Sequence, residues 1–383
     1  MSGIRFDFNN MFSTAVGNMH GVKESQIRES ARKAKEALAH LIRIVTDKDA
    51  RIRLALEWTQ LPFQNKSTIG DIQRLGKEIA QKYENVIFLG IGGSYLGLKA
   101  AQDALAMPYA NEFAKKSIPR IYFEGNNLDP DTLSVLLKNL NPRKTLVVVI
   151  SKSGETTETK LAFIVVEDWL KKATGKNYGR QIFAITDPES GSLRKKVIAE
   201  QKKDVLSFKS LPLLKGVGGR FSEFNMGLLH LAVIGVKIQE VLRGAEEMSA
   251  RCQQKDLYKN PALLYAVLHT ILYRKKGKSI AILMPFSETL KSTADWYVQL
   301  LAESLGKKFA RKIIVDSGGS QRWVRNTERT VNIGRTPISA RGTNDLHSIQ
   351  QNNIEGENNK VITFVRVDKC AREIIVPEGN DFL

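Results

Sequence analysis

The sequence predicts an α/β protein in which two units with parallel sheets follow an N-terminal helical segment. Short apolar runs typical of buried strands alternate with helix-sized segments from residue 86 to about 205, and this alternation returns after residue 276. Parallel strands need crossover connections, and helices in those crossovers cover the sheet faces. A length of 383 residues also favours more than one domain. We expect a helical segment at 1–80, a first α/β unit at 81–210, a helical connection at 211–276 and a second α/β unit at 277–383.

The individual elements follow from hydrophobic spacing. Before the first unit, apolar residues at helical spacing predict helices at 24–44 and 69–82. The first unit should have strands at 86–89, 121–123, 146–150 and 182–185, with helices at 98–105, 132–140 and 157–171. A helical stretch at 221–276, interrupted by Pro261, leads to the second unit, with expected strands at 280–284, 312–315, 361–365 and 374–376. Residues 316–342 are rich in Gly, Ser, Arg and Thr and predict a long functional loop.

A glycine-rich loop follows the first expected strand and contains Gly90, Gly92, Gly93 and Ser94. Glycine lets the backbone approach a ligand closely, and the free N–H groups of the next helix favour an anion such as phosphate. A turn between strand and helix also needs glycine when no ligand binds. Tyr95 replaces the last glycine of the dinucleotide-binding pattern, which disfavours a nicotinamide or flavin site.

A second loop follows the strongest expected strand and is rich in hydroxyl groups. It contains Ser151, Lys152, Ser153, Gly154 and Thr156. Several donors at the end of a strand, backed by a helix N-terminus, suit a tetrahedral anion. The same residue types also cap helices, which is the alternative interpretation. The density of hydroxyl groups favours a phosphate site, with the acidic side chains of this loop turned outward.

Composition narrows the possible partners. The formal net charge of +18 is consistent with nucleic-acid binding or with attraction of anionic substrates. The basic residues are scattered, however, without a basic helix or a basic strand interleaved with aromatics, so we expect no nucleic-acid partner. The longest apolar stretch, 228–236, is too short to span a bilayer, and no membrane partner is expected. Cys252 and Cys370 imply neither a metal site nor a disulfide framework, which together with the lack of a signal peptide favours the cytoplasm.

The two loops together resemble the sugar isomerase (SIS) fold, which binds phosphosugars and consists of flavodoxin-like αβα sandwiches. Three later motifs, at 218–222, 296–307 and 342–348, occur in the order of the glucose-6-phosphate isomerase family. Residues 354–360 resemble it too, although Glu357 stands where the family usually has proline. The resemblance covers nearly the whole chain. It implies reversible isomerisation of glucose 6-phosphate and fructose 6-phosphate, a step of glycolysis and gluconeogenesis that needs no metal or organic cofactor.

The resemblance also implies roles for individual residues. Glu303 matches the family base that moves a proton between C1 and C2 through a cis-enediol, and its apolar neighbours should raise its pKa towards neutrality. Arg220 matches the group that stabilises the charge of the intermediate. The backbone at Gly92, Gly93 and Gly219 should lie against the substrate. Its phosphate should bind Ser94, Ser151, Lys152, Ser153 and Thr156.

His347 is the expected acid and base for ring opening, since the ordinary pKa of histidine is near neutral. In the family the matching histidine comes from the neighbouring subunit, so the resemblance implies a homodimer. Family members usually continue past the position of Leu383, with a near-terminal lysine that helps to open the ring. We therefore expect activity on open-chain substrate far above that on cyclic substrate. His230, amid leucines, is expected to be structural.

Two other classes of function remain as alternatives. One is a SIS-type protein that binds a sugar phosphate without catalysis, and Glu303 and His347 argue against it because a sensor needs no base. The other is a nucleic-acid-binding protein, for which only the net charge argues.

Overall fold

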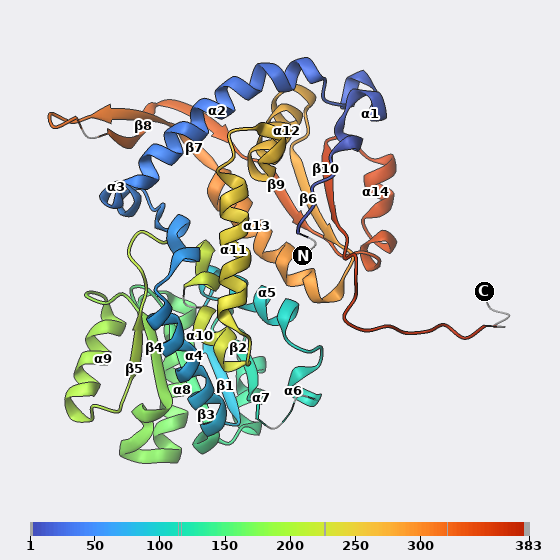
Figure 1. Ribbon diagram of the computed structural model, residues 1–383. Coiled ribbons are helices and arrows are strands. Elements are labelled where there is room, and N and C mark those ends of the chain that lie inside the picture. The colour runs from blue at the N-terminus through green and yellow to red at the C-terminus, as the bar shows by residue number, and fades with distance from the viewer. Residues whose placement is uncertain (1–2, 114, 116, 226, 320, 379–383) are drawn as a thin grey trace.

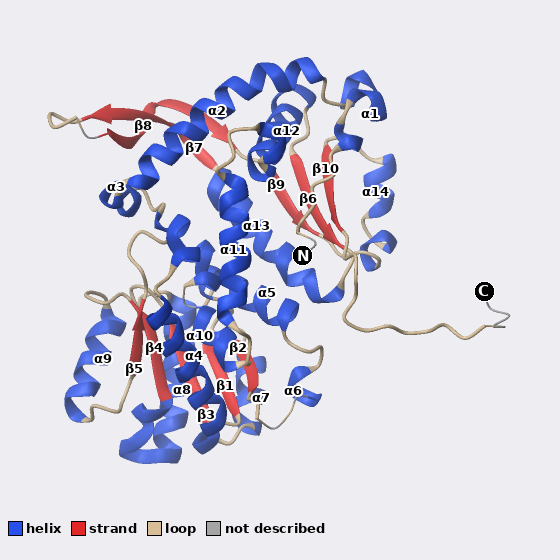
Figure 2. Ribbon diagram, viewed as in Figure 1, coloured by secondary structure: helices blue, strands red, loops and turns tan. Residues whose placement is uncertain are grey.

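The computed structural model describes residues 3–113, 115, 117–225, 227–319 and 321–378, which form two α/β units joined by long helices (Figure 1, Figure 2). The first sheet has five parallel strands in the order β2-β1-β3-β4-β5. Their bounds are β1 Asn85–Leu89, β2 Arg120–Glu124, β3 Thr145–Ile150, β4 Ile182–Thr186 and β5 Lys209–Pro212. Four of these confirm predicted strands. β5 was not predicted, because it is short, partly polar and ends in proline, as edge strands do.

Helices cover both faces of this first sheet. Successive side chains of a strand point to opposite faces, so Val86 and Phe88 join one core cluster while Ile87 and Leu89 join the other. Helices α4 and α10 pack in the first cluster, and α8 and α9 pack in the second. The helices of this unit are α4 Lys66–Lys82, α5 Leu96–Leu105, α6 Ala110–Phe113, α7 Pro130–Asn139, α8 Thr157–Thr174, α9 Ser192–Lys203 and α10 Gly227–Val233.

The strand order creates a reversal in the middle of this sheet. From β1 the chain moves outward to β2, and it then returns to β3 on the other side of β1. The glycine loop follows β1 and the hydroxyl loop follows β3, so both lie at the carboxyl ends of neighbouring strands. Ligands of open parallel sheets bind at such a reversal. The topology therefore places the two predicted phosphate loops together.

The second unit has a smaller parallel sheet of three strands in the order β10-β6-β9. These are β6 Ile280–Pro285, β9 Thr336–Ser339 and β10 Lys360–Val365. Helix α2 of the N-terminal segment packs against α12 in a core of this unit. The remaining helices are α1 Ser13–His20, α2 Glu24–Thr46, α3 Lys48–Arg53, α11 Ile238–Cys252, α12 Pro261–Lys276, α13 Lys291–Leu305 and α14 Gln350–Glu355.

Three expectations for the second unit are wrong. Residues 316–342 are not a long loop, because they contain β9 and most of an antiparallel ribbon in which β7 Lys307–Val315 pairs with β8 Gln321–Ile333. The expected strand at 312–315 is the end of β7 and belongs to this ribbon, not to the parallel sheet. Residues 374–376 form no strand: Ile374 is 93% exposed, and the segment after β10 runs away from the body (Figure 1). Without a neighbouring strand, its apolar residues have nothing to pair with.

The N-terminal helices divide between the two units. α2 packs on the second unit through α12, whereas α4 packs on the first through α10. The expected domain boundaries at 80, 210 and 276 stay predictions. No described helix is both long enough and apolar enough to cross a membrane.

Candidate active site

The glycine loop lies against a loop from a distant part of the chain. Gly92 has a φ of +56°, which glycine adopts without strain. A Cβ on Gly93 would lie 2.3 Å from the backbone of Gly219, so no side chain fits between the two segments. Close backbone approach was predicted here for a ligand. In the structure it also joins the glycine loop, which ends at half-buried Ser94, to the loop that carries Arg220.

The hydroxyl loop uses two of its serines in its own turns. Ser151 Oγ, which is buried, accepts a hydrogen bond from the Gly154 N–H at 3.0 Å, and Ser153 Oγ accepts one from the Glu155 N–H at 3.1 Å. Because both serines act as acceptors here, each still has an O–H to donate. Thr156 is the N-cap residue of α8, and its side chain makes no capping hydrogen bond. The loop thus combines turn capping with donors that suit an anion.

The charged residues of this loop lie at its surface. Lys152 is exposed, and its carbonyl accepts a hydrogen bond from Thr186 Oγ1 at 3.3 Å. Glu155 is exposed and pairs with Lys160 at 2.9 Å, as expected for an acid turned outward. Hydrogen bonds from Ser192 and Lys160 hold the pKa of Glu155 below its ordinary value. Its negative charge is therefore already engaged by a lysine.

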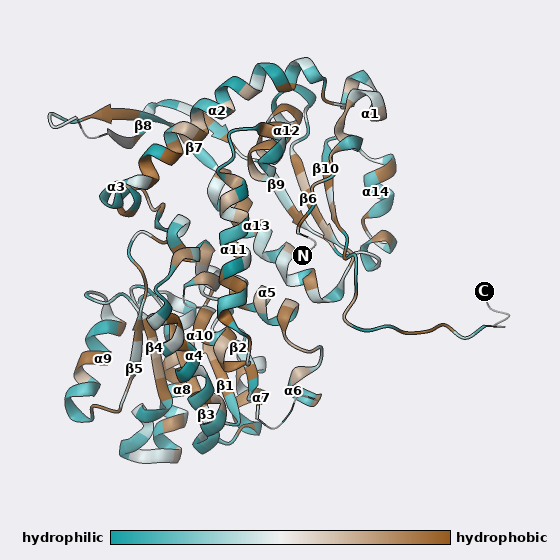
Figure 3. Ribbon diagram, in the orientation of Figure 1, coloured by the Kyte–Doolittle hydropathy of each residue, from teal (hydrophilic) through white to brown (hydrophobic). Residues whose placement is uncertain are grey.

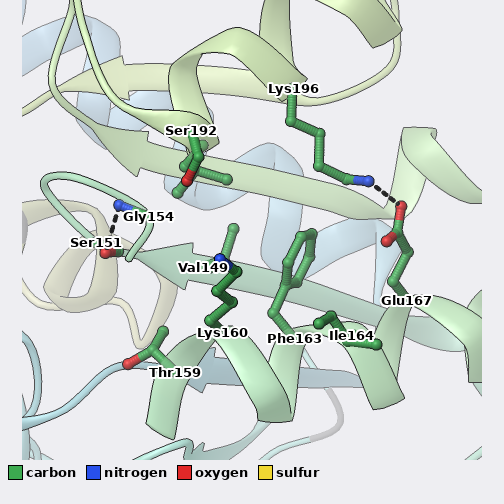
Figure 4. Close-up of a pocket in the computed structure, with 11 residues that line it drawn as sticks. Val149, Ser151, Gly154, Thr159, Lys160, Phe163, Ile164, Glu167, Ser192 and Lys196 are labelled. Carbon is green, nitrogen blue, oxygen red and sulfur yellow. Dashed lines mark hydrogen bonds and ion pairs between the residues drawn. The ribbon is translucent and has the colours of Figure 1, made fainter. Parts of the chain in front are cut away.

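A cavity of about 160 Å³ lies behind the hydroxyl loop, between α8 and α9 (Figure 4). Ser151 and Gly154 line its edge, and an ion pair of 2.8 Å between Lys196 and Glu167 lies along its wall. Its cations already have partners, and the arginine and glutamate of the predicted site do not line it. The cavity is thus separate from the predicted catalytic groups.

Arg220 and Glu303 meet although 83 residues separate them. Arg220 Nη1 lies 2.9 Å from Glu303 Oε2, and Gln299 Nε2 donates to Glu303 Oε1 at 2.9 Å. Trp296 Nε1 donates to the carbonyl of Arg220 at 2.8 Å. A Cβ on Gly92 would lie 3.3 Å from Gln299 Nε2, which places the glycine loop beside this group. The structure thus brings the predicted base, the predicted cation and the glycine loop together.

Gln299 and Trp296 were not singled out from the sequence. Both precede Glu303 on α13, at spacings of four and seven residues, and such positions share one face of a helix. This periodicity was the available signal. It shows which residues lie beside the base, but not that the same face meets the loop of Arg220.

The expected rise in the pKa of Glu303 is wrong. Partial burial does raise its pKa, but hydrogen bonds from Gln299 and Arg220 and the charges of Arg220 and Lys307 outweigh burial and leave the pKa below its ordinary value. The Glu303 side chain is 50% exposed, and Leu305 beside it is 46% exposed. The apolar neighbours in the sequence therefore do not enclose the carboxylate. It is ionised at neutral pH, as a base must be.

His347 lies in a different part of the chain's structure from the contact between Arg220 and Glu303. It is exposed, in a short turn at Asn344–His347 that follows β9. Among the described residues, no hydrogen bond or ion pair links His347 to Arg220 or Glu303. The structure thus joins two of the three predicted catalytic side chains within one chain.

The other expectations concern structural residues and metals. His230 is fully buried, with its Nε2 2.6 Å from Gln102 Oε1 and its ring against Phe88. Burial lowers the pKa of His230 to about 3, so the imidazole is neutral and its structural role is confirmed. Within the described residues, no group of three or more His, Cys, Asp or Glu side chains is placed to hold a metal ion.

The five-stranded order with paired loops at its reversal places the chain in the class of flavodoxin-like α/β proteins. Within that class, the family model of phosphoglucose isomerase matches residues 64–352. A glucose-6-phosphate isomerase of Carboxydothermus hydrogenoformans is 36% identical over 377 residues, which cover 98% of this chain and 75% of the relative. The chain belongs to the phosphoglucose isomerase family.

Solved structures agree with this assignment. A hypothetical protein from Thermus thermophilus superposes with a TM-score of 0.73 at 28% identity, over 94% of this chain and 75% of that one. A glucose-6-phosphate isomerase from Chlamydia trachomatis gives a TM-score of 0.70 at 21% identity, over 90% of this chain and 66% of that one, and supports the fold.

Proposed function

We propose that this chain interconverts glucose 6-phosphate and fructose 6-phosphate through a cis-enediol intermediate, with Glu303 as the base. The observation that carries the proposal is the contact of Glu303 with Arg220 beside the glycine loop. Relatives of the same family that are named glucose-6-phosphate isomerase support it. Nothing favours the alternative of a sugar-phosphate-binding protein without catalysis.

The geometry suggests how the reaction proceeds. The phosphate would bind at the sheet reversal, to Ser94 and to the hydroxyl loop 151–156 with its lysine, because hydroxyl groups and helix N-termini there can donate to it. The sugar would then extend along Gly92, Gly93 and Gly219 towards Glu303. The carboxylate would take the proton from C2 of the aldose and return it to C1, while the hydroxyl proton passes from O2 to O1 and the carbonyl group thereby moves from C1 to C2.

Arg220 has two successive tasks in this scheme. In the free protein its hydrogen bond and charge, together with Gln299 and Lys307, lower the pKa of Glu303. When the substrate binds, the guanidinium would interact with the oxygen atoms that become negative in the enediolate. Any shift of Arg220 from Glu303 to the substrate would raise the proton affinity of the carboxylate, which would make it a better base.

Ring opening and assembly belong to the same proposal. His347 would act as acid and base at the ring oxygen, from the neighbouring subunit of a homodimer. Its exposure and its separation from the Arg220–Glu303 pair are consistent with a role across an interface. A cytoplasmic location fits the free cysteines Cys252 and Cys370.

The test is the conversion of fructose 6-phosphate by purified wild type, Glu303→Gln and the control Glu355→Gln, which changes an exposed glutamate of α14. Removing the base should lower kcat about a thousandfold, and the control should keep wild-type activity. Exchange of the C2 proton with deuterium oxide should be lost together with turnover. Wild-type protein that binds the sugar phosphate without turnover or exchange would support the non-catalytic alternative. Light scattering on the same samples would test the homodimer.

A further inference from the structure

The ribbon of β7 and β8 carries positive charge that the candidate active site does not use. From 307 to 333 the sequence has seven Lys or Arg and two Asp or Glu. The ribbon projects from the second unit (Figure 1). Its exposed cations are Lys308, Arg311, Lys312, Arg325 and Arg329. Within the described part of the chain, none of these five forms an ion pair.

The pairing register places like charges next to each other. Arg311 lies directly opposite Arg325 in the antiparallel ladder. Like charges at directly opposite positions destabilise a strand pair. The guanidinium of Arg325 lies 5.9 Å from the centre of the Phe309 ring, and Lys308 Nζ lies 5.3 Å from it. Both cations thus lie near the same aromatic ring. An anion bound across the ribbon would relieve the repulsion between Arg311 and Arg325.

We propose that the β7–β8 ribbon binds the phosphate backbone of a nucleic-acid duplex, without regard to sequence. Lys307–Val315 as an extended strand spans about 30 Å, close to one turn of a duplex. A two-stranded antiparallel ribbon also fits the major groove of B-form DNA. The sequence alone predicts no such partner, because its basic residues are scattered and form no basic helix or basic strand interleaved with aromatics. Once β8 pairs with β7, cations of both strands stand on one ribbon, with Arg311 and Arg325 on one face and Lys312 on the other.

Other partners fit this surface less well. A second copy of the chain that met this surface with its own ribbon would bring its seven Lys or Arg against these seven, and like charges repel each other. A membrane surface would favour apolar residues at the tip, but residues 316–319 are Asp, Ser, Gly and Gly. Phosphate groups along a duplex match the spread of cations on both strands.

The experiment measures the binding of labelled 20-base-pair DNA and RNA duplexes to the full chain by fluorescence anisotropy, between 50 and 200 mM salt. The test variant combines Arg311→Gln, Lys312→Gln and Arg325→Gln. Its affinity should fall about tenfold or more, and its salt dependence should weaken by about 0.9 in slope for each phosphate that the variant no longer neutralises. Arg325→Gln alone should give a smaller loss in the same direction. The two duplexes distinguish DNA from RNA as the source of the phosphates.

The matched control removes the same charge elsewhere, through Lys138→Gln, Lys176→Gln and Lys202→Gln, which are exposed lysines of the first unit. It should bind duplexes as the wild type does. Isomerase activity should be unchanged in both triple variants, which separates this proposal from the proposed function. Equal losses in test and control, or no duplex binding at 50 mM salt, would overturn the proposal. So would ribbon-dependent binding to phosphatidylserine vesicles in place of duplexes, or a change of oligomeric mass in the test variant.

Discussion

The two α/β units bury their strands to different extents. β1, β3 and β4 of the first sheet are buried along their whole length, and all three appear largely hydrophobic in Figure 3. In the second sheet β6 is buried in part, and every residue of β9 and β10 keeps some exposure. The first unit contributes loops whose backbone is held by a tightly packed sheet. The second contributes side chains from α13. In the proposed function, the first unit would bind the phosphate and the second would supply the base.

The largest effect on activity is expected from removing the charge of Arg220, which pairs with Glu303 of α13. We expect Arg220→Gln to lower kcat by about 100- to 1000-fold, because the enediolate loses its fixed cation. Arg220 also helps to keep the pKa of Glu303 low, so its loss should raise that pKa. With Glu303 as the proposed base, activity would be lost as pH falls through its pKa. The acid limb of the kcat/KM profile should therefore move to higher pH.

The control for this substitution is Arg74→Gln, which removes an exposed arginine paired with Asp71 on α4. It should leave both the rate and the acid limb unchanged. A full loss of activity in Arg220→Gln with an acid limb at its wild-type position would contradict the assignment of Glu303 as a base whose pKa Arg220 lowers.

The next largest effect on activity is expected from pushing the glycine loop away from the loop that carries Arg220. In Gly93→Ala the new methyl group would meet the backbone of Gly219 at 2.3 Å, so the loop that carries Arg220 must move. A displacement of about 1 Å lowers kcat about 100-fold, and overpacking costs about 1–3 kcal/mol of unfolding free energy. Kinetics and thermal melting of the same sample would measure both.

Gly70→Ala is the matched change within the first unit. Gly70 is exposed on α4, with nothing within 4 Å of a new Cβ. Alanine there should stabilise the helix by about 1 kcal/mol and leave activity unchanged. If Gly93→Ala behaved like Gly70→Ala, the contact between the two loops would not matter for catalysis.

The smallest expected effect concerns unfolding free energy, and it compares the packing of the first sheet with that of the second. Ile87 of β1 is fully buried, and Ile87→Val should lower the unfolding free energy by about 1 kcal/mol. Ile362 of β10 is half-buried, and Ile362→Val should cost about 0.5 kcal/mol or less. Urea unfolding of the two variants would compare them. A greater cost at Ile362 would mean that the second sheet is packed as tightly as the first.

Sequence prediction succeeded where burial leaves a local pattern. The strands of the first sheet are continuous apolar runs because helices cover both of their faces. β8 was not predicted, because its residues Gln321–Ile333 are mostly polar or charged and it is stabilised by pairing with β7. Residues 374–376 were predicted as a strand from their apolar character alone. They form no strand, because no described strand pairs with them. Local composition thus predicts buried strands better than ribbons or unpaired segments.

The same distinction applies to the candidate site. The family resemblance pointed to Glu303 and Arg220, and the residues themselves pointed to both predicted phosphate loops, because glycines and hydroxyl groups at strand ends are visible in the sequence. The pKa of Glu303 was predicted in the wrong direction. Neighbours in sequence suggested burial, while Gln299 one helical turn away and Arg220 from another loop decide the shift.

By itself, the sequence determined the class of fold, four of the five strands of the first sheet and the kinds of chemical group available for a phosphate and a proton transfer. These depend on hydrophobic spacing and on residue type, which are local properties. Only the tertiary structure decided that Gly93 meets Gly219, that Arg220 reaches Glu303 and that two basic strands form one ribbon. Such contacts join residues far apart in the chain, and the packing of the whole molecule sets their distances.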